Sequence, residues 1–164
     1  MTSACGVCGS ASVEAVRTTS RYAVADDPLI VAPAVVAGFP EALRARQPVF
    51  ERTGGVHAAG LATANGELLL VREDVGRHNA VDKVVGAAAR DRALPLTGTV
   101  LVTSARASFE IVQKASMAGI PAVVAVGAPT SLAVDLAQEC GITLVAFTRR
   151  PHFSVYARGD RIAS

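Results

Sequence analysis

The sequence predicts an α/β fold, a three-layer α/β/α sandwich built on a mixed β-sheet. Strand-like and helix-like segments alternate from residue 99 to residue 147, which is the pattern of parallel strands joined by right-handed helical crossovers. Before them, two apolar runs at residues 56–64 and 67–73 flank a short turn. They predict a β-hairpin, and an antiparallel hairpin added to parallel strands makes the sheet mixed.

The composition agrees with a folded domain and excludes two classes of protein. The chain has 164 residues, of which 51% are hydrophobic and 18% charged, so it can bury a core and is not intrinsically disordered. Its 16 Lys and Arg nearly balance its 14 Asp and Glu, and a net charge of +2 argues against a nucleic-acid binder. Aromatic residues make up only 4%, so we expect a core of Ala, Val, Leu and Ile.

Cysteine usage and the pattern of apolar residues indicate the compartment. Three cysteines cannot all pair within the chain, and so sparse a count fits a reducing environment. Residues 1–12 lack the basic start and apolar stretch of a signal peptide. The longest uncharged stretch, between Lys114 and Asp135, is broken by two glycines and two prolines, so we expect no membrane span there. We therefore expect a cytoplasmic protein.

The first fifty residues differ from the rest of the chain. Prolines at positions 28, 33, 40 and 48 leave room only for short elements. A helix over residues 34–47 is expected, with an interruption near Pro40. We expect residues 1–50 to form a cysteine-containing loop and a proline-containing arm, and residues 51–164 to form one compact α/β domain.

The hairpin and the helix after it follow from local patterns. Asn65-Gly66 lies between the two apolar runs and suits a type I′ turn, in which both central residues have positive φ. Apolar residues at positions 80, 81, 84, 85 and 88 recur at helical spacing. We expect Asp74, or the turn after it, to cap this helix at its start.

The second half of the chain predicts four further strands and two helices. Residues 99–104, 122–126 and 142–147 are apolar strand-like runs, and residues 107–118 and 131–140 are the helices between them. Gly119 and Gly141 stand where helices end in the left-handed conformation. A short strand at residues 153–157 follows a basic turn.

Polar residues follow the three parallel strands at the ends where α/β sheets bind ligands. These are residues 104–108, 128–131 and 148–150, and two of the three segments also begin helices, whose free N–H groups favour anions. Residues 148–164 hold four arginines, one acid and no lysine. Arginine binds pyrophosphate in bidentate fashion, so we expect a phosphate-bearing ligand there, with Arg106 as a further contact. A solvated basic tail and ordinary helix capping are the alternatives.

Cys5 and Cys8 form a CxxC pair that can share a metal, form a disulfide or exchange sulfur. A structural zinc site needs four ligands, and only Cys140 and three scattered histidines remain, so we expect no metal site. A thioredoxin-like site has its CxxC between a strand and a helix, whereas glycines flank this pair. A mobile loop would suit a thiolate that meets two partners.

Two further polar segments are candidates for chemistry. Residues 53–57 (TGGVH) form either a tight turn or a place where the backbone approaches a ligand beside His57. Residues 72–79 place six polar side chains at a strand-to-helix junction, where they either orient a ligand or are merely solvated. Zinc-deaminase, Walker A, GxGxxG and GxSxG motifs are all absent.

Together these segments resemble the FdhD family of sulfur carriers for formate dehydrogenase. The resemblance lies, in order, in SACGVCG, RTGGVHAAGL, REDVGRHNAVDKVVG, SFEIVQKASMAGIP, APTSLAVDLA and GITLVAF. It implies a cytoplasmic protein with a cytidine-deaminase-like α/β/α fold that lacks the zinc ligands. The family usually has glycine at the position of Ala105, where a positive φ would strain alanine by about 1 kcal/mol.

The resemblance also implies a reaction and its residues. Sulfur would pass as a persulfide from a cysteine desulfurase to the molybdenum cofactor, bis-molybdopterin guanine dinucleotide, which then enters formate dehydrogenase. The persulfide would form on Cys5, and we expect Cys8 to release the sulfur. The implied cofactor-binding residues are Phe147, Thr148, Arg149, Arg150, Pro151 and His152. A cofactor-binding chaperone without sulfur chemistry and a CxxC thiol oxidoreductase are the alternatives, and the sequence leaves open whether the chain forms a homodimer.

Overall fold

The computed structural model describes residues 20–91 and 94–163. The described residues form helices and strands that alternate along most of the chain, and a short 3-10 helix follows the last hairpin. In chain order these are η3 (Val24–Asp26), α1 (Pro33–Arg44), α2 (Pro48–Thr53), β1 (His57–Thr63), β2 (Leu68–Asp74), α3 (Arg77–Asp91), β3 (Thr99–Thr103), α4 (Phe109–Ala118), β4 (Ala122–Ala125), α5 (Ser131–Cys140), β5 (Thr143–Arg149), β6 (His152–Ala157) and η4 (Gly159–Arg161).

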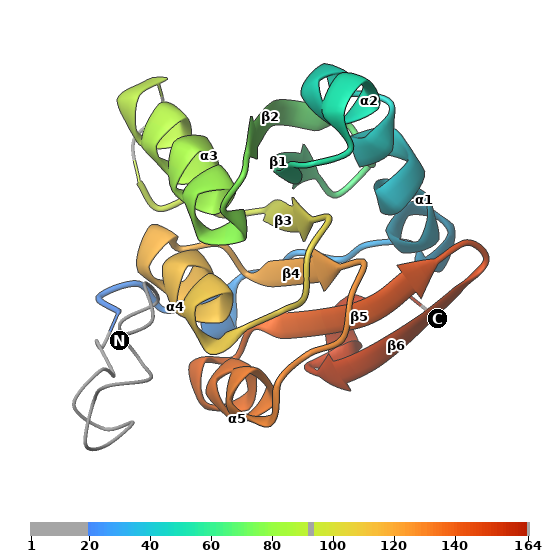
Figure 1. Ribbon diagram of the computed structural model, residues 1–164. Coiled ribbons are helices and arrows are strands. Elements are labelled where there is room, and N and C mark those ends of the chain that lie inside the picture. The colour runs from blue at the N-terminus through green and yellow to red at the C-terminus, as the bar shows by residue number, and fades with distance from the viewer. Residues whose placement is uncertain (1–19, 92–93, 164) are drawn as a thin grey trace.

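The strands form one six-stranded mixed sheet in the order β2-β1-β3-β4-β5-β6 (Figure 1). β3, β4 and β5 are parallel, as the alternation of strands and helices predicts. β1 is antiparallel to both β2 and β3, and β6 is antiparallel to β5. Consequently β2, β3, β4 and β5 all end at the same edge of the sheet.

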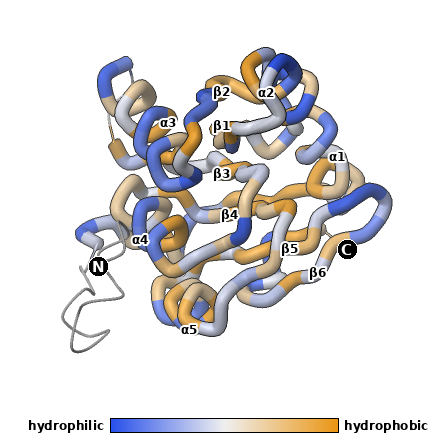
Figure 2. The backbone as a smooth tube through the Cα atoms, in the orientation of Figure 1, coloured by the Kyte–Doolittle hydropathy of each residue, from blue (hydrophilic) through white to orange (hydrophobic). Residues whose placement is uncertain are grey.

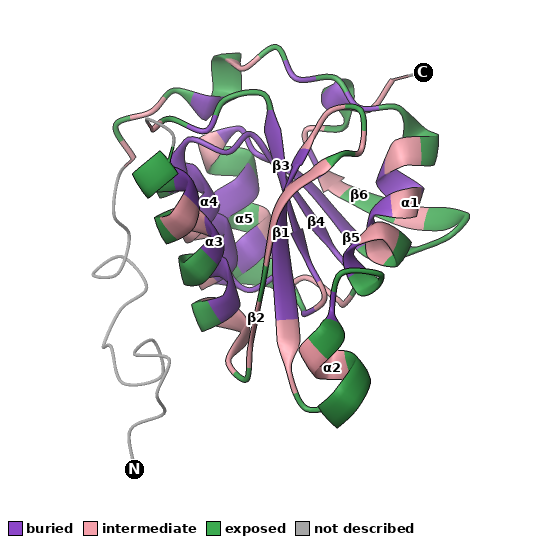
Figure 3. Ribbon diagram, turned by 90° about the horizontal axis from the view of Figure 1, so that it is seen from above, coloured by how far each residue is buried: buried purple, intermediate pink, exposed green. Residues whose placement is uncertain are grey.

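Helices cover both faces of the sheet and confirm the three-layer α/β/α sandwich. α3, α4 and α5 lie on one face and α1 on the other (Figure 3). Alternate residues of a strand point to opposite faces, so Leu101 and Val123 pack under α3, α4 and α5, while Val102 and Val124 pack under α1. Figure 2 shows apolar residues along the central strands and a hydrophilic turn between β5 and β6.

The predicted interruption of the first helix near Pro40 is wrong. α1 runs without a break from Pro33 to Arg44, with Pro40 inside it. Proline removes one backbone hydrogen bond, but Val36, Phe39 and Leu43 on the same helix are buried in the core beneath α1. Residues 20–50 therefore share a core with the sheet. The domain boundary at residue 50 stays a prediction, because residues 1–19 lie outside the described part.

The β1–β2 hairpin is confirmed, but its turn differs from the prediction. Gly66 has a φ of +92°, whereas Asn65 is not among the residues with positive φ, so the turn is not type I′. The Gly66 N–H donates to the Thr63 carbonyl at 3.1 Å, and the Thr63 N–H donates to the Glu67 carbonyl at 2.9 Å. This is a β-turn over residues 63–66 whose last residue is a glycine bulge, the usual three-residue hairpin loop.

The predicted ends of α4 and α5 are confirmed. Gly119 and Gly141 have φ values of +72° and +71° and accept the left-handed conformation that ends each helix. None of the helices in the described ranges is long and apolar enough to span a bilayer.

Candidate functional site

The three polar segments predicted to meet at the carboxyl edge of the sheet do meet there. Ala107 forms a parallel bridge with Pro129, and its N–H donates to the Ala128 carbonyl at 3.1 Å. The Phe147 N–H donates to the Gly127 carbonyl at 3.1 Å. Backbone hydrogen bonds thus join the segments that follow β3 and β4 to the end of β5.

A cavity of about 530 Å³ lies at this edge, between α1 and the β5–β6 turn, and we call it the hairpin cavity. α1 packs against β5 and β6 beside it (Figure 1). Five of the residues predicted to bind the cofactor line it, and Pro40, Glu41 and Val126 form its other wall. The five are Phe147, Thr148, Arg149, Arg150 and His152.

Two predicted residues are not part of this lining. Pro151 lies in the turn between Arg150 and His152. Arg106 is exposed and lies against Gly127, with its Cγ 3.0 Å from where a Cβ on that glycine would stand. A contact of either residue with a ligand stays a prediction.

The polar groups of the hairpin cavity favour an anionic ligand. Arg149 and Arg150 are exposed, and Arg150 Nη1 donates to Glu41 Oε2 at 3.1 Å across the cavity. Thr148 is 1% exposed, yet its Oγ1 has no hydrogen-bond partner. A buried hydroxyl without a partner is costly, so this atom is a candidate hydrogen-bonding group of the cavity wall. The two guanidinium groups beside it match phosphate oxygens.

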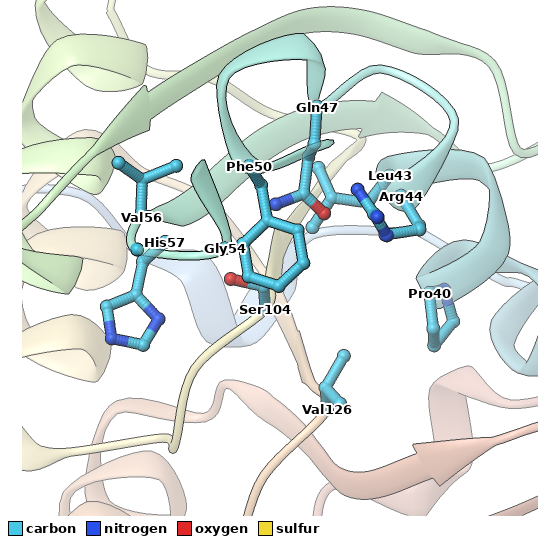
Figure 4. A pocket seen from close by; sticks show the side chains of 11 residues that line it. Pro40, Leu43, Arg44, Gln47, Phe50, Gly54, Val56, His57, Ser104 and Val126 are labelled. Atoms are coloured by element: carbon cyan, nitrogen blue, oxygen red, sulfur yellow. The ribbon is translucent and has the colours of Figure 1, made fainter. Parts of the chain in front are cut away.

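A second cavity of about 470 Å³ lies next to the first, and we call it the α1–α2 cavity (Figure 4). It shares Pro40 and Val126 with the hairpin cavity. The Arg44 guanidinium lies over the Phe50 ring at 4.5 Å. Its other lining residues come from α1, the α1–α2 linker, the turn between α2 and β1, the start of β1 and the residue after β3: Leu43, Gln47, Gly54, Gly55, Val56, His57 and Ser104.

The glycine turn at residues 53–57 therefore borders a cavity. Gly54 ends α2 with a φ of +63°, and His57 begins β1. Arg44 and Phe50 are not predicted from the sequence as cavity-lining residues, because both lie in the segment expected to form an arm. The signal that would have found them is the apolar spacing of Val36, Phe39 and Leu43 along α1, which indicates a buried helix.

The polar junction at residues 72–79 is largely occupied by structural contacts. Both Glu73 carboxylate oxygens accept N–H bonds at the start of α2, from Val49 at 2.9 Å and Phe50 at 2.8 Å. Hydrogen bonds from Lys83 and from the Gly76 N–H lower the pKa of Asp74 to about 2. Asp74 thereby holds the turn before α3, and the predicted capping of the helix start stays a prediction.

His78 lies in the same junction and links α3 to α4. Its Nε2 is 3.1 Å from Ser108 Oγ and 3.7 Å from Glu110 Oε2. Burial and the neighbouring Arg77 charge lower the pKa of His78, which favours the neutral imidazole. His78 is absent from the lining of both cavities described above.

The remaining predicted groups are the cysteines and Ala105. Cys5 and Cys8 lie outside the described residues. Cys140 is a free thiol, partly buried against the core beneath α5. Residues 20–91 and 94–163 hold no cluster of three or more potential metal ligands. Ala105 is not among the residues with positive φ, so alanine is unstrained there.

Comparison with known proteins decides the family. The model of the FdhD/NarQ family matches residues 1–163. The chain belongs to the FdhD/NarQ family. This confirms the resemblance seen in the sequence motifs.

Curated relatives of this FdhD/NarQ chain agree with the family assignment. "Sulfur carrier protein FdhD" of Streptomyces coelicolor is 60% identical over 163 residues, covering 99% of this chain and 58% of that relative. The protein of the same name from Mycolicibacterium paratuberculosis is 59% identical over 161 residues, covering 98% of this chain and 59% of that relative. The chain thus spans less than two thirds of the length of either relative.

A solved structure shares the fold. The solved structure titled "Crystal structure of a putative formate dehydrogenase accessory protein from Desulfotalea psychrophila" superposes with a TM-score of 0.76 at 34% sequence identity. The match covers 84% of this chain and 61% of that one. The α/β fold predicted from the sequence is therefore that of a family member.

Proposed function

We propose that this chain is a sulfurtransferase that carries persulfide sulfur from a cysteine desulfurase to the molybdenum cofactor for formate dehydrogenase. The observation that carries the proposal is the 60% identity, over 99% of the chain, with a protein named sulfur carrier. The aligned part spans nearly the whole sequence, so it includes the segment that holds Cys5 and Cys8.

The first chemical step is a transfer between cysteines. The Cys5 thiolate attacks the terminal sulfur of the donor persulfide, in the same way as in thiol–disulfide exchange. A new S–S bond forms on Cys5 while the S–S bond of the donor breaks. The electron pair of the broken bond leaves with the donor cysteine as its thiolate, so no external oxidant or reductant is needed.

The second step releases the sulfur. The Cys8 thiolate attacks the inner sulfur of the Cys5 persulfide, which forms a Cys5–Cys8 disulfide and expels hydrosulfide toward the metal of the bound cofactor. The two electrons that leave with the hydrosulfide come from the two cysteines. A thiol reductant must therefore reduce the disulfide before the next cycle.

The hairpin cavity supports binding of the cofactor as a substrate. Bis-molybdopterin guanine dinucleotide carries pyrophosphates, and Arg149 and Arg150 offer bidentate donors for them. Thr148 lines the same cavity, and its hydroxyl has no hydrogen-bond partner within the described chain. The ion pair between Arg150 and Glu41 is solvent-exposed and hence weak, so a phosphate can displace the carboxylate.

Mass spectrometry tests the sulfur chemistry. The purified chain is incubated with a cysteine desulfurase and cysteine, and the mass gained by each cysteine is located by peptide mapping. We expect a persulfide on Cys5 that disappears in Cys5→Ala and accumulates in Cys8→Ala, while Cys140→Ala serves as the matched control. A persulfide that survives Cys5→Ala but vanishes in Cys8→Ala would overturn the assigned roles.

Titration calorimetry with guanosine diphosphate tests the cofactor site. The double variant Arg149→Ala/Arg150→Ala should weaken binding by about 1.5–3 kcal/mol per lost charged hydrogen bond. Persulfide formation on Cys5 should be unchanged. A double variant with the same charge loss elsewhere, Arg72→Ala/Arg90→Ala, is the control. Unchanged affinity in the first variant would remove the hairpin cavity from the proposal.

The same experiments separate the two alternatives. Nucleotide binding with no persulfide would indicate a cofactor chaperone whose cysteines only close a loop. Insulin-disulfide reduction with a reversible Cys5–Cys8 couple would indicate a thiol oxidoreductase. We expect a persulfide and no insulin reduction.

A further inference from the structure

The α1–α2 cavity lies beside the hairpin cavity, and the proposed function assigns no ligand to it. Its volume of about 470 Å³ is within the range of pockets that hold a small organic molecule. The two cavities share the side chains of Pro40 and Val126, so one extended ligand can reach both. A ligand whose phosphate binds in the hairpin cavity therefore has room for a further group in the α1–α2 cavity.

A buried amide faces the α1–α2 cavity. Gln47 is 5% exposed, and its side chain points into the cavity (Figure 4). Its backbone N–H and carbonyl are both paired, whereas no hydrogen bond of its side-chain amide is found within residues 20–91 and 94–163. A buried polar group without a partner costs free energy, so this amide is a candidate ligand-binding group.

A flat wall made of an aromatic ring and a guanidinium group lies in the same cavity. The guanidinium carbon of Arg44 lies 4.5 Å from the centroid of the Phe50 ring, over one of its faces. Phe50 is only partly buried and lines the cavity, so part of its ring surface is open to a ligand. Planar heterocycles stack on aromatic rings and on guanidinium planes. The wall therefore fits a planar ring.

The wall is held in place by the neighbouring strand. The Glu73 carboxylate, at the end of β2, accepts the N–H groups of Val49 and Phe50 in the first turn of α2. The left-handed conformation of Gly54 then ends α2 and turns the chain toward His57. The aromatic ring is thus positioned before any ligand binds, which is the arrangement expected of a binding site.

We propose that the α1–α2 cavity binds a planar nitrogen heterocycle, with Gln47 pairing to its edge and Phe50 stacking on its face. The amide offers N–H donors and a carbonyl acceptor side by side, which match a ring that carries an N–H next to a carbonyl. The pterin and guanine rings of the proposed cofactor both have such an edge. This inference rests on the proposed cofactor site and adds to it a second cavity, with its own residues, for a part of the ligand that carries no phosphate.

Calorimetry with a ring probe and a phosphate probe tests this division between the two cavities. Pterin is a ring without phosphate, and inorganic pyrophosphate is phosphate without a ring. Gln47→Met and Phe50→Leu should each bind pterin about tenfold more weakly and should bind pyrophosphate as the wild type does. Arg149→Ala/Arg150→Ala should show the reverse pattern. Gln138→Met, at an exposed position on α5, is the matched control and should bind both probes normally.

Urea unfolding separates a ligand-binding amide from a structural one. Gln47→Met keeps the length of the side chain and removes its polar group, so we expect a free energy of unfolding equal to or above that of the wild type. A free energy of unfolding clearly below the wild-type value would show that the amide supports the fold, and would overturn its assignment to a ligand.

A guanosine titration identifies the ring. Pterin binding that is weakened in Gln47→Met supports the pterin end of the cofactor as the occupant of the cavity. Guanosine binding that is weakened in the same variant, without any pterin binding, supports the guanine end.

The inference and the proposed function fail in different ways. Unchanged affinity for both rings in Gln47→Met and Phe50→Leu, or a wild-type chain that binds pyrophosphate but neither ring, would overturn the ring cavity and leave the arginine site intact. A wild-type chain that binds none of the three probes would overturn the proposed cofactor site as well.

Discussion

At the scale of single residues, Arg161 shows how one buried side chain joins distant segments. It is 2% exposed, and its guanidinium donates to the carbonyls of Val24 at 2.6 Å, Ala25 at 3.0 Å and Gly141 at 2.7 Å. Burial lowers its pKa, yet the planar group still satisfies several carbonyls at once. The segment around η3 is thereby fixed to the turn before β5.

Replacing Arg161 should show that the stability of the fold depends on the several N–H donors of its planar guanidinium, and not only on its charge. We expect Arg161→Lys to lower the free energy of unfolding by about 2 kcal/mol or more, because a lysine leaves buried carbonyls without donors. Arg158→Lys is the control, since Arg158 pairs with Asp160 at an exposed site and should change stability by less than about 1 kcal/mol. Equal effects of the two variants in urea denaturation would contradict this account.

His78 gives the fold a pH dependence whose sign follows from its lowered pKa. A histidine whose pKa is lower in the folded state binds its proton better when unfolded, so acid favours unfolding. The contribution of His78 is complete above the unfolded pKa of about 6.5 and is lost as pH falls below it. We expect His78→Gln to flatten the decline in stability between pH 7.5 and 5.5. Identical slopes in His78→Gln and the wild type would exclude the assignment.

At the scale of elements, helix ends were easier to predict than helix continuity. Glycines at positions 119 and 141 mark the ends of α4 and α5 in the sequence, because few other residues accept the left-handed conformation. Pro40 led to the wrong prediction that α1 is interrupted, because helix propensity does not include the burial of Phe39 and Leu43 in the core. The predicted turn type of the β1–β2 hairpin was wrong for a related reason. Asn-Gly fits two loop geometries, and the register between the two strands decides which of them forms.

Gly119 should be intolerant of any side chain. A Cβ there would lie 2.3 Å from the Cβ of Pro95, in addition to the strain of a φ of +72°. Gly119→Ala should therefore lower the free energy of unfolding by about 2 kcal/mol or more. Gly86 is an exposed residue inside α3 with no atom within 4 Å of its would-be Cβ, so Gly86→Ala should stabilise the protein by about 0.5–1 kcal/mol. Urea unfolding in which both variants change the free energy of unfolding in the same direction would contradict the geometry.

At the scale of the whole molecule, the sequence indicated the residues that follow β5 in the hairpin cavity better than it indicated the residues of the opposite wall. The rule that ligands bind at the carboxyl ends of parallel strands led directly to Thr148, Arg149 and Arg150. The opposite wall, formed by α1, depends on contacts between residues far apart in the chain, which no local pattern reveals. The positive φ of Phe147 was equally invisible, because a bulge is set by strand register and not by the residue that occupies it.

Because α1 forms part of the core, the chain should unfold α1 and the sheet together. Phe39 is 1% exposed in the core beneath α1, so Phe39→Ala should lower the free energy of unfolding by about 3–5 kcal/mol in a single transition. Ile30→Ala, at an exposed position in the same part of the chain, should have little effect. If α1 belonged to a separate arm, Phe39→Ala would leave the unfolding of the sheet unchanged.

Restoration of formate dehydrogenase activity in cells that lack their own sulfur carrier tests the central claim most directly. The wild-type chain should restore activity. Cys5→Ala and Arg149→Ala/Arg150→Ala, present at equal soluble levels, should not, because the proposed function assigns the sulfur acceptor to Cys5 and the cofactor site to the two arginines. Cys140→Ala should restore activity as the wild type does. Restoration by Cys5→Ala, or failure of the folded wild-type chain, would contradict the account.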